Sequence, residues 1–409
     1  MNRVFIIGNG FDLAHGLPTS YNHFINDFWS NLKDDFKKQI NSELLHIDDS
    51  YTGFFDFTKP TKCFNDFIQN IKDYANEREC RFDEKKIRLK KSRDQFKFVF
   101  EFKNELFLTI NKNQSIDNWV DIENLYYSEL KKIVKSKSLD VTESDESWAR
   151  KSRKRVAILN KEFKQIEDLL KSYLTKIIDK YNFESKDDEW MSFYQLFKPI
   201  SLFNNESKLL EEFMDSEDKD SIKLLFDEEK KSNDKTRTTS YFLSFNYTPT
   251  LYKYVDSLKK DNYDIRLNQI HGKVEGDVVF GFGDESDVDY HLIEDINDNE
   301  YLNFFKSFKY LENKNYNNFL NFIDSEPFQL IIMGHSLGLS DRVLLKTIFE
   351  NENCKSIKAY YHQGNYDDNF RDIIQNMSRH FSDKSLMRKK VVNKLLCKPL
   401  PQIQIPLKS

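Results

Sequence analysis

The sequence predicts an α/β protein in which both ends of the chain form one parallel sheet and the middle is mostly helical. The first observation is the distribution of the 11 glycines, because none occurs from residue 54 to residue 271. Glycine marks tight turns and close backbone approaches, so the turn-rich segments lie near the two ends. The second observation is a set of short apolar runs that end at a polar or glycine-containing loop and precede a helix, a pattern typical of a parallel sheet covered on both faces. These runs are Arg3–Ile7, Ser240–Asn246, Ile265–His271, Val278–Gly281, Gln329–Met333 and Ser356–His362.

The middle of the chain has the composition and spacing of helices. No proline occurs between Pro60 and Pro199, so long helices are permitted there. Apolar residues recur at helical spacing over 119–133 and again over 161–181. The predicted organisation is a discontinuous α/β domain of residues 1–30 and 238–382, a mostly helical insertion of residues 31–237, and a basic C-terminal tail of residues 383–409.

Composition argues against several classes of protein. The 409 residues include 62 Lys and Arg and 67 Asp and Glu, and the net charge of −5 argues against a general polyanion binder, though not against a single basic patch. The four cysteines form no CxxC pair, so no metal site is predicted, and scattered thiols fit a reducing cytoplasm. The apolar start ends at Gly8, too early for a signal-peptide core, and no apolar run approaches the ~18 residues of a membrane span. We expect a cytoplasmic protein that does not enter a membrane.

The first candidate site is the loop that follows the first strand run. At this position α/β folds bind phosphates, because free backbone N–H groups and the dipole of the next helix point at the loop. The pattern GxGxxG is incomplete, since Leu13 stands at the third glycine position. The alternative is an ordinary strand-to-helix turn with an aspartate cap. The candidate nucleotide-binding residues are Gly8, Asn9, Gly10, Phe11 and Asp12.

Two polar side chains at the ends of later strand runs are candidate catalytic residues. Asn246 lies where α/β sheets bind ligands, at the carboxyl end of a strand. His271 precedes Gly272, and a histidine can act as a general base because its unperturbed pKa is near neutrality. Each has a structural alternative, since Asn246 can stabilise the turn before Pro249 and His271 can be hydrogen-bonded within its loop.

The segment GHSLGLSD, residues 334–341, has two interpretations. It matches the GxSxG pattern of a hydrolase nucleophile elbow, with Ser336 as the nucleophile and His362 or His380 as the base. An elbow requires a helix directly after the serine, whereas this sequence predicts a loop and a helix that begins near Arg342. We therefore predict a ligand-binding loop that uses Gly334, Ser336 and Asp341.

The predicted insertion contains a carboxylate on an apolar helical face. In the segment WVDIE, Glu123 lies on the same helical face as Trp119 and Tyr126. A carboxylate on an apolar face needs a partner or a ligand. Glu123 is therefore either bonded to a basic group or a helix end, or part of the wall of an active site.

In this order, the segments IIGNGFDLAHGLPTSY, WVDIE, SFNYTPTL, IHG, GFGDE and GHSLGLSD resemble the AbiH family of bacterial phage-defence (abortive infection) proteins. The resemblance implies a role in phage defence. A phage-derived trigger and further copies of the same chain in a homo-oligomer are the partners to expect, beside a nucleotide.

More distantly, the segments resemble the sirtuin-like NAD-consuming domains of many defence systems. The matching elements are a GAGxS loop, a TxNxD strand end, an HG pair and a later Gly-x-Ser-x-x-Asp stretch. Their counterparts here are Gly8 and Gly10, Asn246, His271 and Gly272, and Gly334, Ser336 and Asp341. Two residues depart from the pattern, since Asp12 replaces the loop serine and Thr248 replaces the acidic residue of TxNxD.

This second resemblance implies a Rossmann-like, sirtuin-like sheet that hydrolyses NAD at the nicotinamide–ribose bond. NAD would be the substrate, and no cofactor would be required. The Gly8–Phe11 loop would hold the pyrophosphate, Asn246 would orient the water or the ribose, and His271 would act as the base. The chain has no zinc ribbon, which argues against protein deacetylation.

Two other functions stay open. The protein can be a nucleotide sensor or regulator that does no chemistry and whose insertion reports to a partner. It can also be an effector that acts on nucleic acid through the tail, for which the alternative is a solvated, mobile terminus. The basic residues of the tail are Lys384, Arg388, Lys389, Lys390, Lys394, Lys398 and Lys408.

Overall fold

The computed structural model divides the chain into two compact units. It describes residues 1–37, 43–48, 59–91, 98–113, 116, 119–136, 144–185, 188–198, 206–232 and 238–408. The first unit comprises Met1–Thr19, Leu174–Tyr290 and Phe305–Ser409, and the second comprises Ser20–Tyr173 and His291–Phe304. The units therefore divide the chain at other places than the predicted domains, because the segment from Leu174 onward joins the unit that contains both chain ends.

The first unit contains a five-stranded parallel sheet with the strand order β7-β6-β1-β8-β9. Its strands are β1 (Asn2–Ile7), β6 (Thr239–Ser244), β7 (Asp264–Gln269), β8 (Phe328–Met333) and β9 (Cys354–Tyr360). The predicted parallel sheet is thus confirmed, with five of the six predicted strands. Val278–Gly281 is the exception, since Val278 makes only an isolated bridge to Gly272. In chain order the strands run 3-2-1-4-5, so the direction of winding reverses between β1 and β8.

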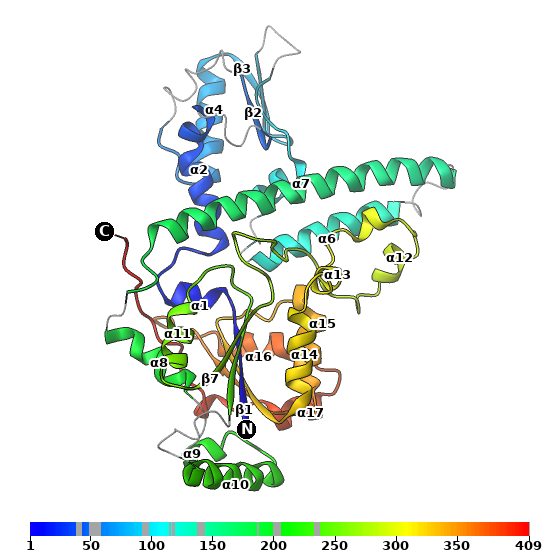
Figure 1. The fold of residues 1–409 in the computed structure, drawn as a ribbon. Helices are drawn as coiled ribbons and strands as arrows, with labels where there is room; N and C mark the ends of the chain where they lie inside the picture. The colour runs from blue at the N-terminus through cyan, green and yellow to red at the C-terminus, as the bar shows by residue number, and fades with distance from the viewer. Residues whose placement is uncertain are drawn as a thin grey trace. The chain divides into compact units, whose positions relative to one another are not determined.

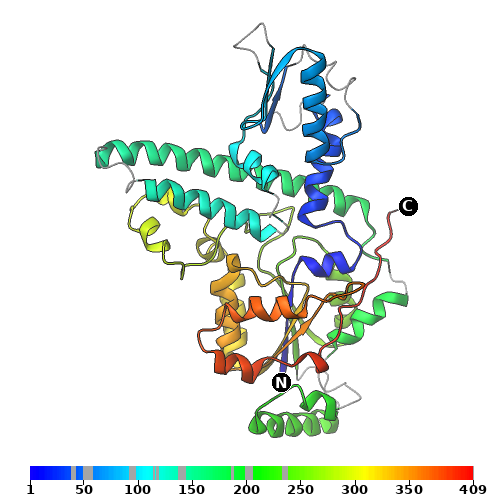
Figure 2. The same cartoon turned by 180° about the vertical axis from the view of Figure 1, so that it is seen from behind.

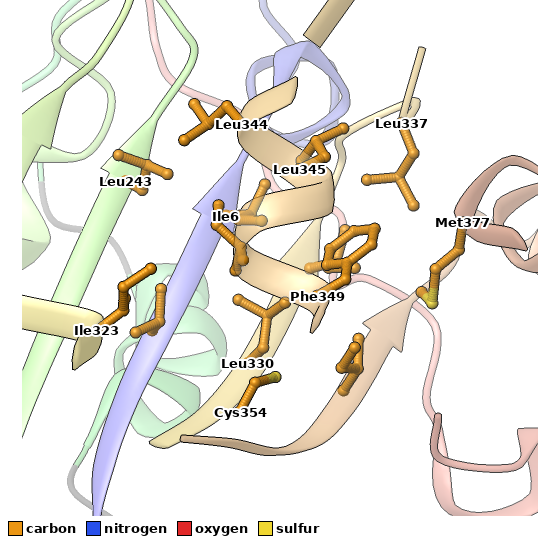
Figure 3. Close-up of a cluster of buried hydrophobic side chains, with 14 of the residues drawn as sticks. Ile6, Leu243, Ile323, Leu330, Leu337, Leu344, Leu345, Phe349, Cys354 and Met377 are labelled. Carbon is orange, nitrogen blue, oxygen red and sulfur yellow. The ribbon is translucent and has the colours of Figure 1, made fainter. Parts of the chain in front are cut away.

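Helices cover both faces of this sheet, as the continuous apolar strands require. Every residue of β1, β6 and β8 is buried. One face packs against α14 (Asn315–Ser325), α15 (Arg342–Glu350) and α16 (Phe370–Ser378), and Figure 3 shows Leu344 and Phe349 of α15 beside Ile6 and Leu330. The other face packs against α1 (Asn9–Ala14), α8 (Met191–Phe197) and α11 (Tyr252–Lys260). Figure 1 shows α11 and α8 on one side of the strands and α14 and α15 on the other.

The first unit also contains several shorter elements and the predicted tail. They are η3 (Asp188–Trp190), α9 (Glu206–Leu210), α10 (Ser216–Ser232), α13 (Lys306–Tyr310), η6 (Leu339–Asp341), α17 (Lys384–Lys390) and η7 (Lys394–Leu396). Over residues 383–408 several apolar side chains of the tail pack against the core, whereas Lys390 is the one basic side chain of this segment that is buried. Lys390 donates hydrogen bonds to the carbonyls of Phe349 at 3.0 Å and Asn351 at 2.6 Å, and Val392 and Cys397 belong to the apolar core.

The second unit combines helices with a four-stranded antiparallel sheet that the sequence analysis did not predict. The sheet has the order β2-β5-β4-β3, with β2 (Leu45–Ile47), β3 (Cys80–Asp83), β4 (Arg88–Lys91) and β5 (Phe98–Phe102). These strands are short, and β3 and β4 are largely charged, so they carry little apolar signal. The helices are α2 (Tyr21–Lys37), α4 (Phe64–Glu77), α5 (Glu105–Lys112), α6 (Trp119–Lys135) and most of α7 (Asp145–Lys180), with α12 (Tyr290–Glu294) and η5 (Asn299–Leu302) from the later segment.

The two segments with helical spacing form helices α6 and α7, as predicted, and the structure pairs them side by side (Figures 1 and 2). The ring of Tyr126 lies 4.3 Å from that of Phe163, and its hydroxyl donates to Asn160 at 2.7 Å. The segment that contains η5 is fastened to α7, because the Tyr301 hydroxyl donates to Ser152 at 2.8 Å. None of the helices in the described part of the chain combines the length and the apolar character needed to cross a membrane.

Candidate functional site

The segments singled out at the two ends of the chain meet at one edge of the parallel sheet. The Asn246 side chain, just after β6, donates to the carbonyl of Gly8, just after β1, at 3.1 Å. The N–H of Gly10 donates to the carbonyl of Gly334, just after β8, at 2.7 Å. The carboxyl ends of these parallel strands thus bring together loops that are more than 80 residues apart in the sequence.

The glycines in these loops are required by the contact between the loops themselves. A Cβ atom at Gly8 would lie 2.5 Å from the Cα of His335. Gly334 has a φ of +70°, and a Cβ there would lie 2.1 Å from the backbone nitrogen of Phe11. The N–H groups of Gly8 and Gly10 already donate to the carbonyls of Met333 and Gly334. These two N–H groups are therefore not available to a ligand. The prediction that this loop binds a pyrophosphate depends on the remaining N–H groups and side chains of Gly8–Asp12.

Asp12 is buried below the first loop, and its side chain is hydrogen-bonded to the segment that follows β6. Its Oδ2 accepts a hydrogen bond from the Thr248 hydroxyl at 2.6 Å. Burial raises the pKa of Asp12 to about 6, although hydrogen bonds from Thr248, Thr250 and Asn246 favour the charged form. Asp12 makes no side-chain cap for α1, so the capping alternative is not what the structure contains.

We expect the substitution Asp12→Asn to change how stability depends on pH. The pKa of Asp12 is about 6 in the folded protein against 3.8 ordinarily, so the folded state binds this proton more tightly between pH 4 and 6. The wild type therefore loses stability as the pH rises through this window, by about 3 kcal/mol relative to the variant. Urea unfolding of both proteins from pH 4 to pH 7 measures this difference, and a difference that does not change with pH would contradict the assignment.

His271, at the end of the β7 segment, faces a buried ion pair. Its Nε2 lies 3.2 Å from Asp341 Oδ1 and 3.2 Å from the Tyr310 hydroxyl. Lys306 donates to the same Asp341 oxygen at 2.8 Å and to Ser340 at 3.3 Å. Burial acts to raise the pKa of Asp341, but Lys306 and His271 outweigh it and hold that pKa well below its usual value. Asp341 is therefore a carboxylate at neutral pH and orients the His271 ring.

A second histidine, His335, lies beside this pair and is neutral. Its Nδ1 accepts the Leu337 N–H at 3.0 Å, which leaves the proton on Nε2, 3.9 Å from Asp341 Oδ2. Burial lowers the pKa of His335 to about 4, against the opposing charge of Asp341. The ring of Phe245 lies between the two histidines, with centroid distances of 4.8 Å to His271 and 4.3 Å to His335.

The structure does not contain a nucleophile elbow at Ser336. Leu337, directly after it, has a φ of +56°, and the chain continues as a loop until η6. Helix α15 begins at Arg342, as predicted from the sequence. His380 binds the Leu337 carbonyl through Nε2 at 2.9 Å. Ser336 is exposed on the loop, and its suggested binding role stays a prediction.

Three residues of the cluster were missed by the sequence analysis, namely Lys306, Tyr310 and His335. His335 lies inside the GHSLGLSD segment, but the patterns matched to that segment pointed to Gly334, Ser336 and Asp341 instead. Lys306 follows two phenylalanines, and a lysine within an apolar run is the one signal that could have indicated a buried partner. The GFGDE segment carries it into place, because the Lys306 N–H donates to the Phe282 carbonyl at 2.9 Å.

Glu123 belongs to the second unit. It is buried in α6 together with Ile122 and Tyr126, as the helical spacing predicted. Trp119 packs against the rings of Tyr21 and Phe24 in the same unit, at centroid distances of 6.0 and 5.1 Å. A contribution of Glu123 to an active-site wall stays a prediction.

A family model described as "Bacteriophage abortive infection AbiH" matches residues 4–363, a span that includes every segment at the sheet edge from Gly8 to Asp341. No curated protein matches the sequence. Within the described residues there is no group of three or more His, Cys, Asp or Glu side chains arranged to hold a metal ion. The family match covers most of the chain, and the protein therefore belongs to the AbiH family of bacteriophage abortive infection proteins.

Proposed function

We propose that this protein acts in phage defence by hydrolysing NAD at the nicotinamide–ribose bond. The observation that carries the proposal is the meeting of the Gly8–Asp12 loop, Asn246 and the His271–Asp341 pair at one edge of the sheet. The strand order 3-2-1-4-5 also supports it, because doubly wound sheets of this order bind dinucleotides where the winding reverses. Here that point lies between β1 and β8, beside the loops of Gly8 and Gly334.

The two departures from the sirtuin-like pattern support the proposal once they are considered together. That pattern has a hydroxyl residue in the loop and an acidic residue after the strand, and this chain has Asp12 and Thr248 in the reverse arrangement. The two side chains are hydrogen-bonded at 2.6 Å. In this proposal the two departures are an exchange of the hydroxyl and the carboxylate across one contact, so that the site keeps one group of each kind.

In the proposed mechanism, His271 is the general base. With Nε2–H donated to Asp341, its Nδ1 carries the lone pair and takes a proton from the attacking water. The water oxygen bonds to C1′ of the ribose, and the C1′–N bond breaks with its electron pair moving onto the nicotinamide nitrogen. The products are nicotinamide and ADP-ribose, and the proton on His271 is released to solvent.

The other residues hold and orient the base and the reacting groups. Asp341 stabilises the imidazolium that His271 becomes, and its own charge is maintained by Lys306. Because Asp341 is engaged by both groups, it orients the base and does not attack the ribose. Asn246 is fixed through Nδ2 to Gly8, and its Oδ1 supplies an acceptor for the water or a ribose hydroxyl.

The proposal is tested by incubating the purified full-length chain with NAD, with and without lysate from phage-infected cells. We expect NAD to disappear as nicotinamide and ADP-ribose appear in equal amounts, measured by liquid chromatography. NAD that stays intact under every activating condition would contradict the proposal. ATP and NADP in parallel reactions determine whether another nucleotide is consumed instead.

A nucleotide sensor without chemistry is the second candidate. The burial of His271 and Asp341, which are 6% and 4% exposed, favours it, because a base must reach its substrate. Calorimetry separates the two functions, since a sensor binds NAD or a related nucleotide tightly and releases it unchanged.

A further inference from the structure

The beginning of α7 carries a concentrated positive charge that the proposed function does not use. The stretch Arg150–Arg155 has the sequence RKSRKR, with five basic residues and no acidic one, in a chain whose net charge is −5. All five basic side chains are exposed. Ser152, between them, is buried and accepts the Tyr301 hydroxyl. The inward face of α7 is thus occupied by small and apolar residues, and the outward surface of this stretch is basic.

The end of α6 extends this charge. Ser136 accepts hydrogen bonds from Trp148 Nε1 at 3.3 Å and from the Arg155 guanidinium at 3.5 Å, which places the last turn of α6 beside the stretch. The two helices lie side by side in both views of the fold (Figures 1 and 2). Lys132 and Lys135 of that last turn are also exposed. The basic patch, as we name it, consists of Lys132, Lys135, Arg150, Lys151, Arg153, Lys154 and Arg155.

Acidic neighbours neutralise only part of the basic patch. Lys132 pairs with Glu129 at 2.7 Å, and Arg153 pairs with Asp298 at 3.1 Å. Among the residues that the structure describes, no ion pair is found for Arg150 or Lys154. These two lie four positions apart on one helical row, where like charges repel each other in the absence of an anion. The patch is therefore suited to a ligand with several negative charges.

We propose that the basic patch binds nucleic acid through its phosphate groups, without reading base sequence. A membrane surface fits less well, because an interfacial helix inserts an apolar face, whereas the apolar face of α7 is covered by Tyr126 and Phe304. Three of the seven basic residues are arginines, whose planar guanidinium groups match phosphate oxygens in pairs. The proposal does not depend on the NAD chemistry, which concerns other residues.

The test is fluorescence anisotropy of the full-length chain with labelled single-stranded DNA, duplex DNA and RNA of mixed sequence. The variant is Arg150→Gln/Lys154→Gln, and the matched control is Arg388→Gln/Lys389→Gln. The control removes the same two charges from exposed positions of α17, in the segment predicted as a basic tail. Circular dichroism and melting curves verify that both variants fold as the wild type does.

We expect wild-type binding that weakens steeply between about 50 and 200 mM salt. The patch variant should bind about tenfold more weakly, with a logarithmic salt dependence reduced by about 2, one for each lost phosphate contact. The control should keep wild-type affinity. The proposal is overturned if the wild type binds no nucleic acid at low salt or if both variants lose affinity equally. It is also overturned if the chain binds polyaspartate, or vesicles rich in phosphatidylserine, but no nucleic acid.

Discussion

Replacing His271 by glutamine is expected to slow NAD hydrolysis by about 10²–10⁴-fold, the usual contribution of a general base. Glutamine can still donate a hydrogen bond toward Asp341, so the buried carboxylate keeps a partner, but it cannot take a proton from water. The measurement is the rate of nicotinamide release under the condition that activates the wild type. We expect the loss in kcat with a smaller change in KM, because His271 acts on the water rather than holding the nucleotide.

The matched control for this experiment is His380→Gln. His380 is also buried and also makes a hydrogen bond through Nε2, but to the Leu337 carbonyl. Its loss has a comparable structural cost without removing the proposed base, and we expect NAD turnover to stay within a few-fold of wild type. If His271→Gln hydrolyses NAD as fast as the wild type does, His271 is not the base and the site assignment fails.

Replacing Lys306 by methionine is expected to lower the free energy of unfolding by about 3–5 kcal/mol, because it leaves the buried Asp341 carboxylate without its strongest cation. Methionine fills a similar volume, so the loss reports the charge rather than a cavity. The pKa of Asp341 would rise once Lys306 is absent, because Lys306 is the strongest of the influences that oppose burial. The deficit should therefore be larger at pH 8 than at pH 5, where protonation relieves part of it.

Two further variants show whether this loss comes from the ion pair. Lys309→Met changes the same residue type one turn later on α13, where Nζ donates to the Val278 carbonyl and the side chain is only half-buried. Its cost should be below about 1 kcal/mol. Combining Lys306→Met with Asp341→Asn removes both charges and should recover part of the stability. Equal losses in Lys306→Met and Lys309→Met, measured by urea unfolding, would show that the buried pair contributes nothing.

The strands of the parallel sheet could be predicted because their signal is local. β1, β6 and β8 are buried on both faces, so each appears in the sequence as a short, mainly apolar and aromatic run without the alternation of a half-exposed strand. The antiparallel sheet was not predicted because β3 and β4 are four residues long and rich in charged residues, so they carry little apolar signal. The run Val278–Gly281 has the composition of a strand, but in the described part of the chain its pairing is limited to the isolated bridge between Val278 and Gly272, and composition does not reveal pairing partners.

The loops of the candidate site could be predicted from the sequence, whereas its buried ion pair could not. Gly8, Asn246 and His271 were found because each stands where an apolar strand ends, and a parallel sheet brings such positions to one edge. Lys306 was not found, because no local sequence pattern indicates a buried ion pair. Its partner Asp341 is 35 residues away, and the two meet only when α13 is carried over the sheet edge by the segment that follows Phe282.

The sequence alone determined the parallel sheet, the loops at its carboxyl edge and the family resemblance, since these depend on short patterns of apolar, glycine and polar residues. Only the tertiary structure decided that Asp12 and Thr248 form one contact and that Lys306 and Asp341 hold His271. It also decided that the C-terminal segment belongs to the first unit. The physical reason is that hydrogen bonds and ion pairs act over a few ångströms in space, so residues far apart in the chain become partners only after the fold has brought them together.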